Sequence, residues 1–381
     1  MNEQANSDYI KNPAENIFIN KIADFFLAGI IVFNGILNFI LGEIISEGLC
    51  ISLFLIYLCS KIKTKIYFPL HLVLLIIFIL ISIAQAFNTE NQIRLLFLYP
   101  YLFFMAIIML PVYEKNSELD SNFIAKIFIY FAVISSLYAV SQRLGFSILL
   151  SVENEIRATG LSRSSLNLTG CLFSALAVCL LTARKNYKSL IFELIIFLGL
   201  VAAGGRGGMI SAIILLVCIY LKDFKNNKKL SFFMVLSIII IAIITGKHFQ
   251  RAFSAFNFSD DQSNLERLDA YLLFFKQFQI FGGGIGTTSP AVMRFASATG
   301  FESSLLNIIY ELGIGFSIIF AAGIIAWFTK LQNTIRKNLL ILAIAILPMF
   351  AGQQLYGIPS AFVSLILCTY IILSNRERLE L

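Results

Sequence analysis

The chain has 381 residues, of which 58% are hydrophobic and only 13% are charged, and its mean hydropathy is +0.84. A soluble domain carries about 25% charged residues and must present polar atoms to water, so this composition excludes a soluble globular protein. A net charge of +7 would suggest nucleic acid as a partner of a soluble protein. In so apolar a chain the position of each charge matters more than the sum, and we expect no nucleic-acid partner.

The first stretch, Met1 to Asn16, is polar, and no small-residue cleavage site follows the first apolar run. We therefore expect this run to remain as a helix rather than to act as a cleaved signal peptide.

Apolar segments of membrane-spanning character recur along the whole chain. They lie near residues 20–41, 44–60, 66–87, 95–113, 122–142, 165–183, 189–204, 208–221, 230–247, 302–329, 338–352 and 355–374. The sequence therefore predicts an all-α polytopic membrane protein with about 12 transmembrane helices in a single integral membrane domain, residues 1–381.

Lysines indicate the orientation of these helices. Alternate loops carry lysine clusters near residues 61–65, 185–188, 222–229 and 330–337. Positive charge concentrates on the cytoplasmic side of membrane proteins, so we expect both termini in the cytoplasm.

Arginines follow a different pattern. In this topology 15 of the 17 lysines, but only four of the 12 arginines, fall on the inner side. A topology signal is indifferent to the two residue types, whereas a phosphate site favours the planar fork of arginine. The outer arginines are Arg94, Arg143, Arg157, Arg163, Arg206, Arg251, Arg267 and Arg294. Snorkelling at the interface is the preferred interpretation for Arg94, Arg143 and Arg251 and an equal alternative for Arg163 and Arg294.

The connection after the ninth segment, residues 248–301, is long for a helix bundle, which is typical of a functional loop. Within it Ser263 and Glu266 form a capping-box pattern, which predicts a helix near 264–281 at the membrane surface. This helix would present Arg267 and Tyr271 one turn apart.

A glycine-rich stretch, Gly282 to Gly286, ends that helix. Its amides could converge on an anion, or it could be a plain turn. Thr299 and Glu302 then form a second capping box at the start of the tenth segment. Glu302 could cap this helix, accept a proton from an incoming hydroxyl, or do both. Glu311, about half a turn out of phase with Glu302, is expected to face protein or a wet cavity.

Two more outer clusters surround arginines. Arg206 lies in the glycine hairpin of residues 204–208, and Arg157 precedes the segment that leads through Arg163 to Asn167. An arginine in a tight hairpin favours an anionic ligand.

These pieces, in this order, resemble the bacterial O-antigen polymerase and O-antigen ligase superfamily. The matching positions are Arg157–Gly160, Asn167, Arg206, Arg267, Gly282–Gly286, Phe301–Asn307 and Glu311–Gly313. The resemblance implies a GT-C-like architecture in the bacterial inner membrane, with a periplasmic active site that needs no metal and no cofactor. Ligases carry histidine where this chain has Glu302, which favours a polymerase.

The resemblance also implies the reaction. A polymerase takes an undecaprenyl-pyrophosphate-linked oligosaccharide as donor and another as acceptor. Arg157, Arg206, Arg267 and Arg294 are expected to bind pyrophosphate, Arg206 and Arg267 also being catalytic, because charge develops on the leaving group. Glu302 is the expected base, and the residues expected to position substrate are Arg163, Asn167, His248, Tyr271, Gly284 and Gly286. Partners besides substrate are membrane lipids and could include a chain-length regulator.

Two other functions fit less well. A ligase would transfer the glycan to lipid A-core. A flippase for the same lipid would also have about a dozen helices, but it would be expected to show repeats or broken helices in matching halves and charge inside its spans.

Overall fold

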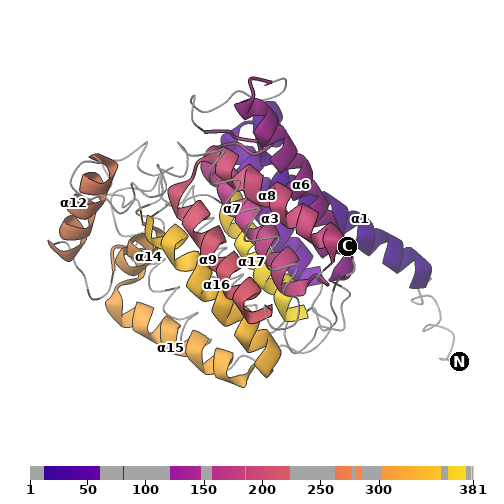
Figure 1. Cartoon of the computed structure of the whole chain (residues 1–381). Helices are drawn as coiled ribbons and strands as arrows, with labels where there is room; N and C mark the ends of the chain where they lie inside the picture. The colour runs from indigo at the N-terminus through magenta and orange to yellow at the C-terminus, as the bar shows by residue number, and fades with distance from the viewer. Residues whose placement is uncertain are drawn as a thin grey trace, which may run out of the picture.

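The computed structural model describes residues 13–60, 80, 121–146, 157–184, 186–223, 262–276, 280, 282–284, 288, 303–352, 359–374, 379 and 381. Within these ranges the chain is almost entirely helical and has no named strand. The helices are α1 (Pro13–Val32), α2 (Asn34–Leu41), α3 (Glu43–Ser60), α6 (Asn122–Arg143), α7 (Ser165–Thr182), α8 (Tyr187–Ala203), α9 (Arg206–Asp223), α12 (Gln262–Lys276), α14 (Ser304–Leu312), α15 (Ile314–Lys330), α16 (Asn333–Gly352) and α17 (Pro359–Ser374). Figure 1 shows α3, α6, α7, α8, α9, α16 and α17 packed together, with α12 at the margin of the molecule.

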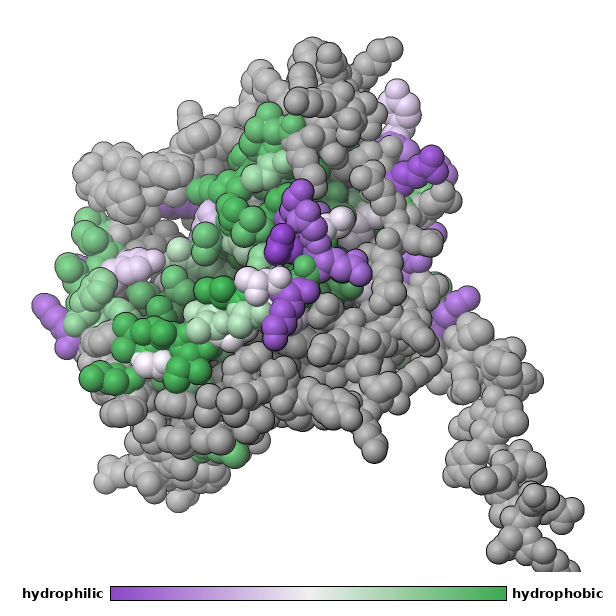
Figure 2. Space-filling view, turned by 90° about the horizontal axis from the view of Figure 1, so that it is seen from below, coloured by the Kyte–Doolittle hydropathy of each residue, from purple (hydrophilic) through white to green (hydrophobic). Residues whose placement is uncertain are grey.

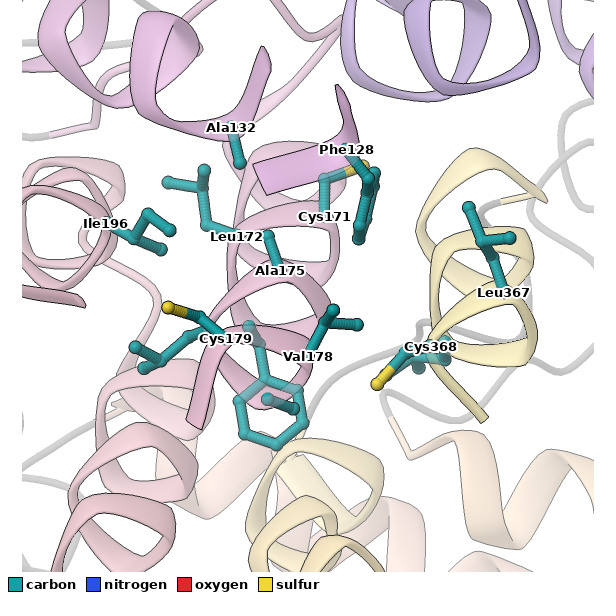
Figure 3. Close-up of a cluster of buried hydrophobic side chains, with 14 of the residues drawn as sticks. Phe128, Ala132, Cys171, Leu172, Ala175, Val178, Cys179, Ile196, Leu367 and Cys368 are labelled. Atoms are coloured by element: carbon teal, nitrogen blue, oxygen red, sulfur yellow. The ribbon is translucent and has the colours of Figure 1, made fainter. Parts of the chain in front are cut away.

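Helix α7 is the centre of the bundle, because nearly all of its side chains are buried and it packs against α6, α8, α9 and α17. Figure 3 shows its apolar side chains meeting those of α6, α8 and α17. Cys171, Cys179 and Cys368 lie in this cluster as buried thiols. They serve as small apolar side chains.

Small residues set the closest helix contacts. Where one apolar helix meets another in lipid, association depends on close packing rather than on escape from water. A Cβ atom added at any of three glycines would come within 2.5 Å of a neighbouring helix. These contacts are Gly170 of α7 on Ala361 of α17, Gly199 of α8 on Ser136 of α6, and Gly208 of α9 on Thr169 of α7.

One end of the bundle gathers lysines. The last turn of α7 lies there with the first turn of α16, because the Asn338 side chain donates to the Leu181 carbonyl. The chain terminus joins them, since the Leu379 amide donates to the Thr182 carbonyl. Helices α8 and α16 begin at this end of the bundle. We call it the lysine end because it carries Lys188, Lys330 and Lys337.

Two of the expected spans are broken, which corrects the sequence prediction. Segment 20–41 divides into α1 and α2, which meet at an angle of 78°, and segment 302–329 divides into α14 and α15, at 113°. At the second break Gly313 has φ 78°, a conformation open to glycine because it lacks a Cβ. At the first, the Gly35 amide donates to the Leu161 carbonyl of a distant segment.

Three described helices, α6, α7 and α16, are long and apolar enough to cross a membrane, and five spans result if each bent pair counts as one. Much of the coloured surface seen from below in Figure 2 is apolar. Exposed side chains such as Ile318 and Ile325 of α15 fit contact with lipid. The expected segments near 66–87, 95–113 and 230–247 lie outside the described residues apart from Leu80, and a total of 12 spans stays a prediction.

The glycine contacts lead to a stability prediction. Gly170→Ala brings a methyl group against Ala361 and should cost about 1–3 kcal/mol, seen as a lower melting temperature of the detergent-purified protein. Gly48→Ala is the matched control, because its Cβ would meet no atom within 4 Å. This control should be neutral or stabilising by about 0.5–1 kcal/mol. Equal effects of the two substitutions would contradict the packing.

The two ends of the bundle also allow a topology test. Phe146 follows α6 and Tyr187 begins α8, and the two side chains are 66% and 74% exposed at opposite ends. In a background without native cysteines, Phe146→Cys should react with an impermeant maleimide in intact spheroplasts. Tyr187→Cys should react only after permeabilisation. The reverse pattern would invert the orientation predicted from the lysines.

Candidate functional site

A buried, non-helical segment, residues 158–162, organises the end of the bundle opposite to the lysine end. It lies between α6 and α7, and each of its residues is buried. The Ala158 amide donates to the Ala202 carbonyl of α8, and the Gly160 amide donates to the Gln142 side chain of α6 at 2.8 Å. Helices α6 and α8 therefore accept the hydrogen bonds that residues within the same segment would accept if it were helical.

The same segment also reaches the break between α1 and α2. The Leu161 amide donates to the Ser135 hydroxyl of α6, and the Ser162 hydroxyl donates to the Val32 carbonyl at the end of α1. We call this segment the buried crossing. It joins α1, α2, α6 and α8 at one end of the bundle.

Arginines surround the buried crossing. Arg157 and Arg163 flank it, and both are partly buried. Arg206 begins α9, directly after the Gly204 turn that ends α8, so the bond from Ala158 to Ala202 brings its segment close to Arg157. Arg143 is the last residue of α6 at the same end. We call this the arginine end.

Arg157 has a donor that no described residue uses. Its Nε atom is buried, and none of the described residues accepts a hydrogen bond from it. A buried donor without an acceptor costs about 1–3 kcal/mol, so an anionic ligand at this point would recover that cost.

Asn167 connects two helices. It lies in the first turn of α7, where Ser164 caps the helix and donates to the Asn167 carboxamide oxygen at 2.7 Å. The Asn167 carboxamide nitrogen donates to the Ser360 hydroxyl of α17 at 2.5 Å. This residue therefore positions the beginnings of α7 and α17, whatever its relation to substrate.

Glu311 is fully buried at the end of α14, as the sequence predicts. Its carboxylate accepts from both the amide and the hydroxyl of Thr288, at 2.9 and 2.6 Å. The Gly283 and Gly284 amides donate to the Tyr310 and Glu311 carbonyls. Two amides that could have faced an anion are thus used to fasten the long loop to the break between α14 and α15.

The loop helix α12 overlaps the range expected for it, 264–281, but it begins at Gln262, so Ser263 lies inside the helix instead of capping it. It packs on α14 through Phe274 and Leu306. Its Tyr271 hydroxyl donates to the Ala351 carbonyl near the end of α16 at 3.1 Å. Ser303, which caps α14, lies against the neighbouring Phe350 carbonyl. Tyr271 therefore lies at the junction of α12 and α16.

Several expected site residues lie outside the described residues: His248, Gly286, Arg294 and Glu302. Arg267 belongs to α12, but its side chain also lies outside the description. The described helix α14 begins at Ser304 with Ser303 as its cap, so the capping box expected at Thr299 and Glu302 does not begin this helix. Ser303 was the better cap because its hydroxyl accepts from the Leu306 amide.

Buried carboxylates inside the helices are the main feature that sequence reasoning missed. Glu193 of α8 is fully buried and accepts hydrogen bonds from the Tyr220 hydroxyl and the Cys179 thiol. Asp24 of α1 is 4% exposed and interacts with the Tyr57 hydroxyl. A single acidic residue inside each apolar run was the available signal.

The class of this protein is assigned from the described helices and arginines. No protein-family model matches the chain, and no curated protein matches it significantly. The described helices thus define a helical protein with three to five candidate membrane spans and a cluster of arginines at one end.

The Glu311 contact yields a stability prediction. Glu311→Gln keeps an oxygen acceptor for Thr288, whereas Glu311→Ala leaves two donors without one and should cost about 1–3 kcal/mol or more. Thr288→Ser should behave as wild type and Thr288→Val should resemble Glu311→Ala in part. Melting temperatures in detergent measure all four variants. Equal values for Glu311→Ala and Glu311→Gln would show that the contact contributes nothing.

Proposed function

We propose that this protein is a surface-polysaccharide polymerase of the bacterial inner membrane. It joins undecaprenyl-pyrophosphate-linked oligosaccharide repeats at the periplasmic face, within a frame of about 12 spans. The proposal combines the resemblance noted in the sequence with the arrangement of charge at the arginine end.

One observation carries the proposal. The hydrogen bond between Ala158 and Ala202 draws together two segments that are distant in the sequence, and each bears an arginine, Arg157 and Arg206. Two arginines on segments that are joined in this way support recognition of a pyrophosphate, which accepts paired hydrogen bonds. The lysines at the opposite end fit a topology signal.

In the proposed reaction, an acceptor sugar hydroxyl attacks the anomeric carbon of the donor glycan. A new glycosidic C–O bond forms, and the bond from the anomeric carbon to the pyrophosphate oxygen breaks. Undecaprenyl pyrophosphate leaves with the electron pair, and Arg157, Arg206 and Arg267 stabilise its charge. The hydroxyl proton passes to the Glu302 carboxylate.

A flippase for the same lipid is the second candidate, and two observations favour it. The breaks at α1–α2 and α14–α15, one toward each end of the chain, are of a kind found in transporters. Asp24 and Glu193 also place carboxylates inside the helices, although the sequence patterns suggested neither feature. Both carboxylates, however, have tyrosine neighbours within the bundle, which gives them a structural role. The polymerase remains the preferred function.

Deletion of the gene separates these functions. Lipid A-core that carries a single repeat would support the polymerase. Lipid A-core without repeats, together with lipid-linked polymer, would indicate a ligase. Repeats that accumulate on the cytoplasmic side would indicate a flippase.

The arginine clamp is tested by substitution. Arg206→Ala and Arg267→Ala should abolish chain growth while protein levels stay normal, and Arg157→Ala should reduce it by at least about tenfold, because transition-state charge loses a partner. Glycan length on gels of complemented deletion cells measures the effect. Arg336→Ala, at the exposed start of α16, is the control and should be silent. Glycan of wild-type length from both Arg206→Ala and Arg267→Ala would refute the clamp.

A further inference from the structure

The short helix α2 has its polar and apolar faces reversed relative to a surface helix of a soluble protein. Its Asn34 side chain is 0% exposed, whereas Phe39 and Ile40 are 82% and 68% exposed. In a membrane the apolar face of such a helix meets lipid, and the polar face points to the protein interior. Helix α2 thus directs Asn34 toward the interior of the protein and its large apolar side chains outward.

The Asn34 carboxamide has no partner in the described part of the chain. Neither its oxygen nor its nitrogen makes a hydrogen bond to any described residue. One helical turn later, the Asn38 carboxamide oxygen is likewise buried and accepts from none of the described residues. Residues four apart on a helix share a face, about 6 Å from each other. Unpaired groups of this kind are rare in folded proteins and call for a specific cause.

This pair lies beside the arginines. The first turn of α2 rests directly on the buried crossing: the Gly35 amide donates to the Leu161 carbonyl, and a Cβ at Gly35 would meet the Arg163 amide nitrogen at 2.9 Å. On the other side of the crossing lies Arg157, whose Nε is also unused by the described residues. Helix α2, which carries the two asparagines, therefore packs at one end of the buried crossing, and Arg157 stands at its other end.

The chemistry of the pair indicates its ligand. A carboxamide offers both a donor and an acceptor, which matches the hydroxyl groups of a sugar, whereas a phosphate is acceptor-rich and calls for arginine. We propose that Asn34 and Asn38 form the subsite for the sugar unit joined directly to the lipid pyrophosphate, which they hold through its hydroxyl groups. This inference rests on the proposed function, because the arginine end must first bind the pyrophosphate.

Access to the subsite requires movement of α2, since Asn34 has no exposed surface. The ends of α2 allow it: Phe33 is non-helical at φ −98° and ψ 25°, and Gly42 follows at φ 81°. A sugar bound there is shielded from water, so each hydrogen bond to it contributes strongly to discrimination.

The test measures binding to full-length protein in nanodiscs with two probes. One is the lipid-linked repeat extracted from cells that lack the gene; the other is undecaprenyl pyrophosphate without sugar. Asn34→Leu should lower affinity for the repeat about tenfold and leave affinity for the sugar-free lipid unchanged. Its melting temperature should equal or exceed that of wild type, because an apolar side chain replaces a polar one that none of the described residues hydrogen-bonds.

Controls separate binding from folding. Asn186→Ala removes an asparagine that caps α8 and accepts from the Ser189 amide, so it should lower the melting temperature without changing the preference between probes. Asn38→Leu is a second test that avoids the first turn of α2, and it should act in the same direction as Asn34→Leu.

The outcomes distinguish the two proposals. Unchanged affinity of Asn34→Leu and Asn38→Leu for the repeat would overturn the subsite and leave the pyrophosphate clamp intact, as would equal affinity of wild type for both probes. A lower melting temperature of Asn34→Leu with parallel losses for both probes would make Asn34 structural and overturn the subsite. Wild-type protein that binds neither probe would overturn the proposed function and the subsite together.

Discussion

The structure of the arginine end depends on hydrogen bonds to the backbone of the buried crossing, a non-helical segment inside an apolar bundle. The buried crossing carries amides and carbonyls into an interior where the segment, because it is not helical, cannot supply their partners itself, and unsatisfied groups in such surroundings are costly. Gln142 and Ser135 of α6 and the Ala202 carbonyl of α8 provide those partners. Because these bonds come from separate helices, they also fix where the helices end. The arginine positions follow from this arrangement.

A second fastening holds the long loop. Glu311 and the carbonyls of α14 bind Thr288 and the glycine turn, so the loop is attached where α14 breaks from α15. The glycines are needed for close approach: a Cβ at Gly282 would lie 2.4 Å from the Glu311 carbonyl oxygen and the Gly313 nitrogen. The glycine turn could have bound an anion through its amides, but the Gly283 and Gly284 amides donate to carbonyls of α14 instead. The loop and the broken helix form one structural unit at this point.

Particular residues show how far sequence patterns reach. The hairpin at residues 204–208 was predictable, because glycine ends a helix in the left-handed conformation that Gly204 adopts. The breaks at Phe33 and Gly313 were not, since each lies within an apolar run as long as a span. The sequence analysis missed the structural roles of three isolated polar residues, Gln142, Asn34 and Thr288. The hydrogen bonding of each depends on segments that are far away in the chain. The expected roles of Arg267, Arg294 and Glu302 stay predictions.

By itself the sequence determined an apolar helical chain, because length and hydropathy are local properties. It also indicated that two groups of charges lie apart: Arg143, Arg157, Arg163 and Arg206 are at one end of the bundle, and Lys188, Lys330 and Lys337 are at the other. Only the tertiary structure decided that two apolar runs bend, that Glu311 holds the loop, and that a hydrogen bond between Ala158 and Ala202 joins the segments of Arg157 and Arg206. Those outcomes depend on hydrogen bonds between residues far apart in the chain, and no local pattern specifies such pairs.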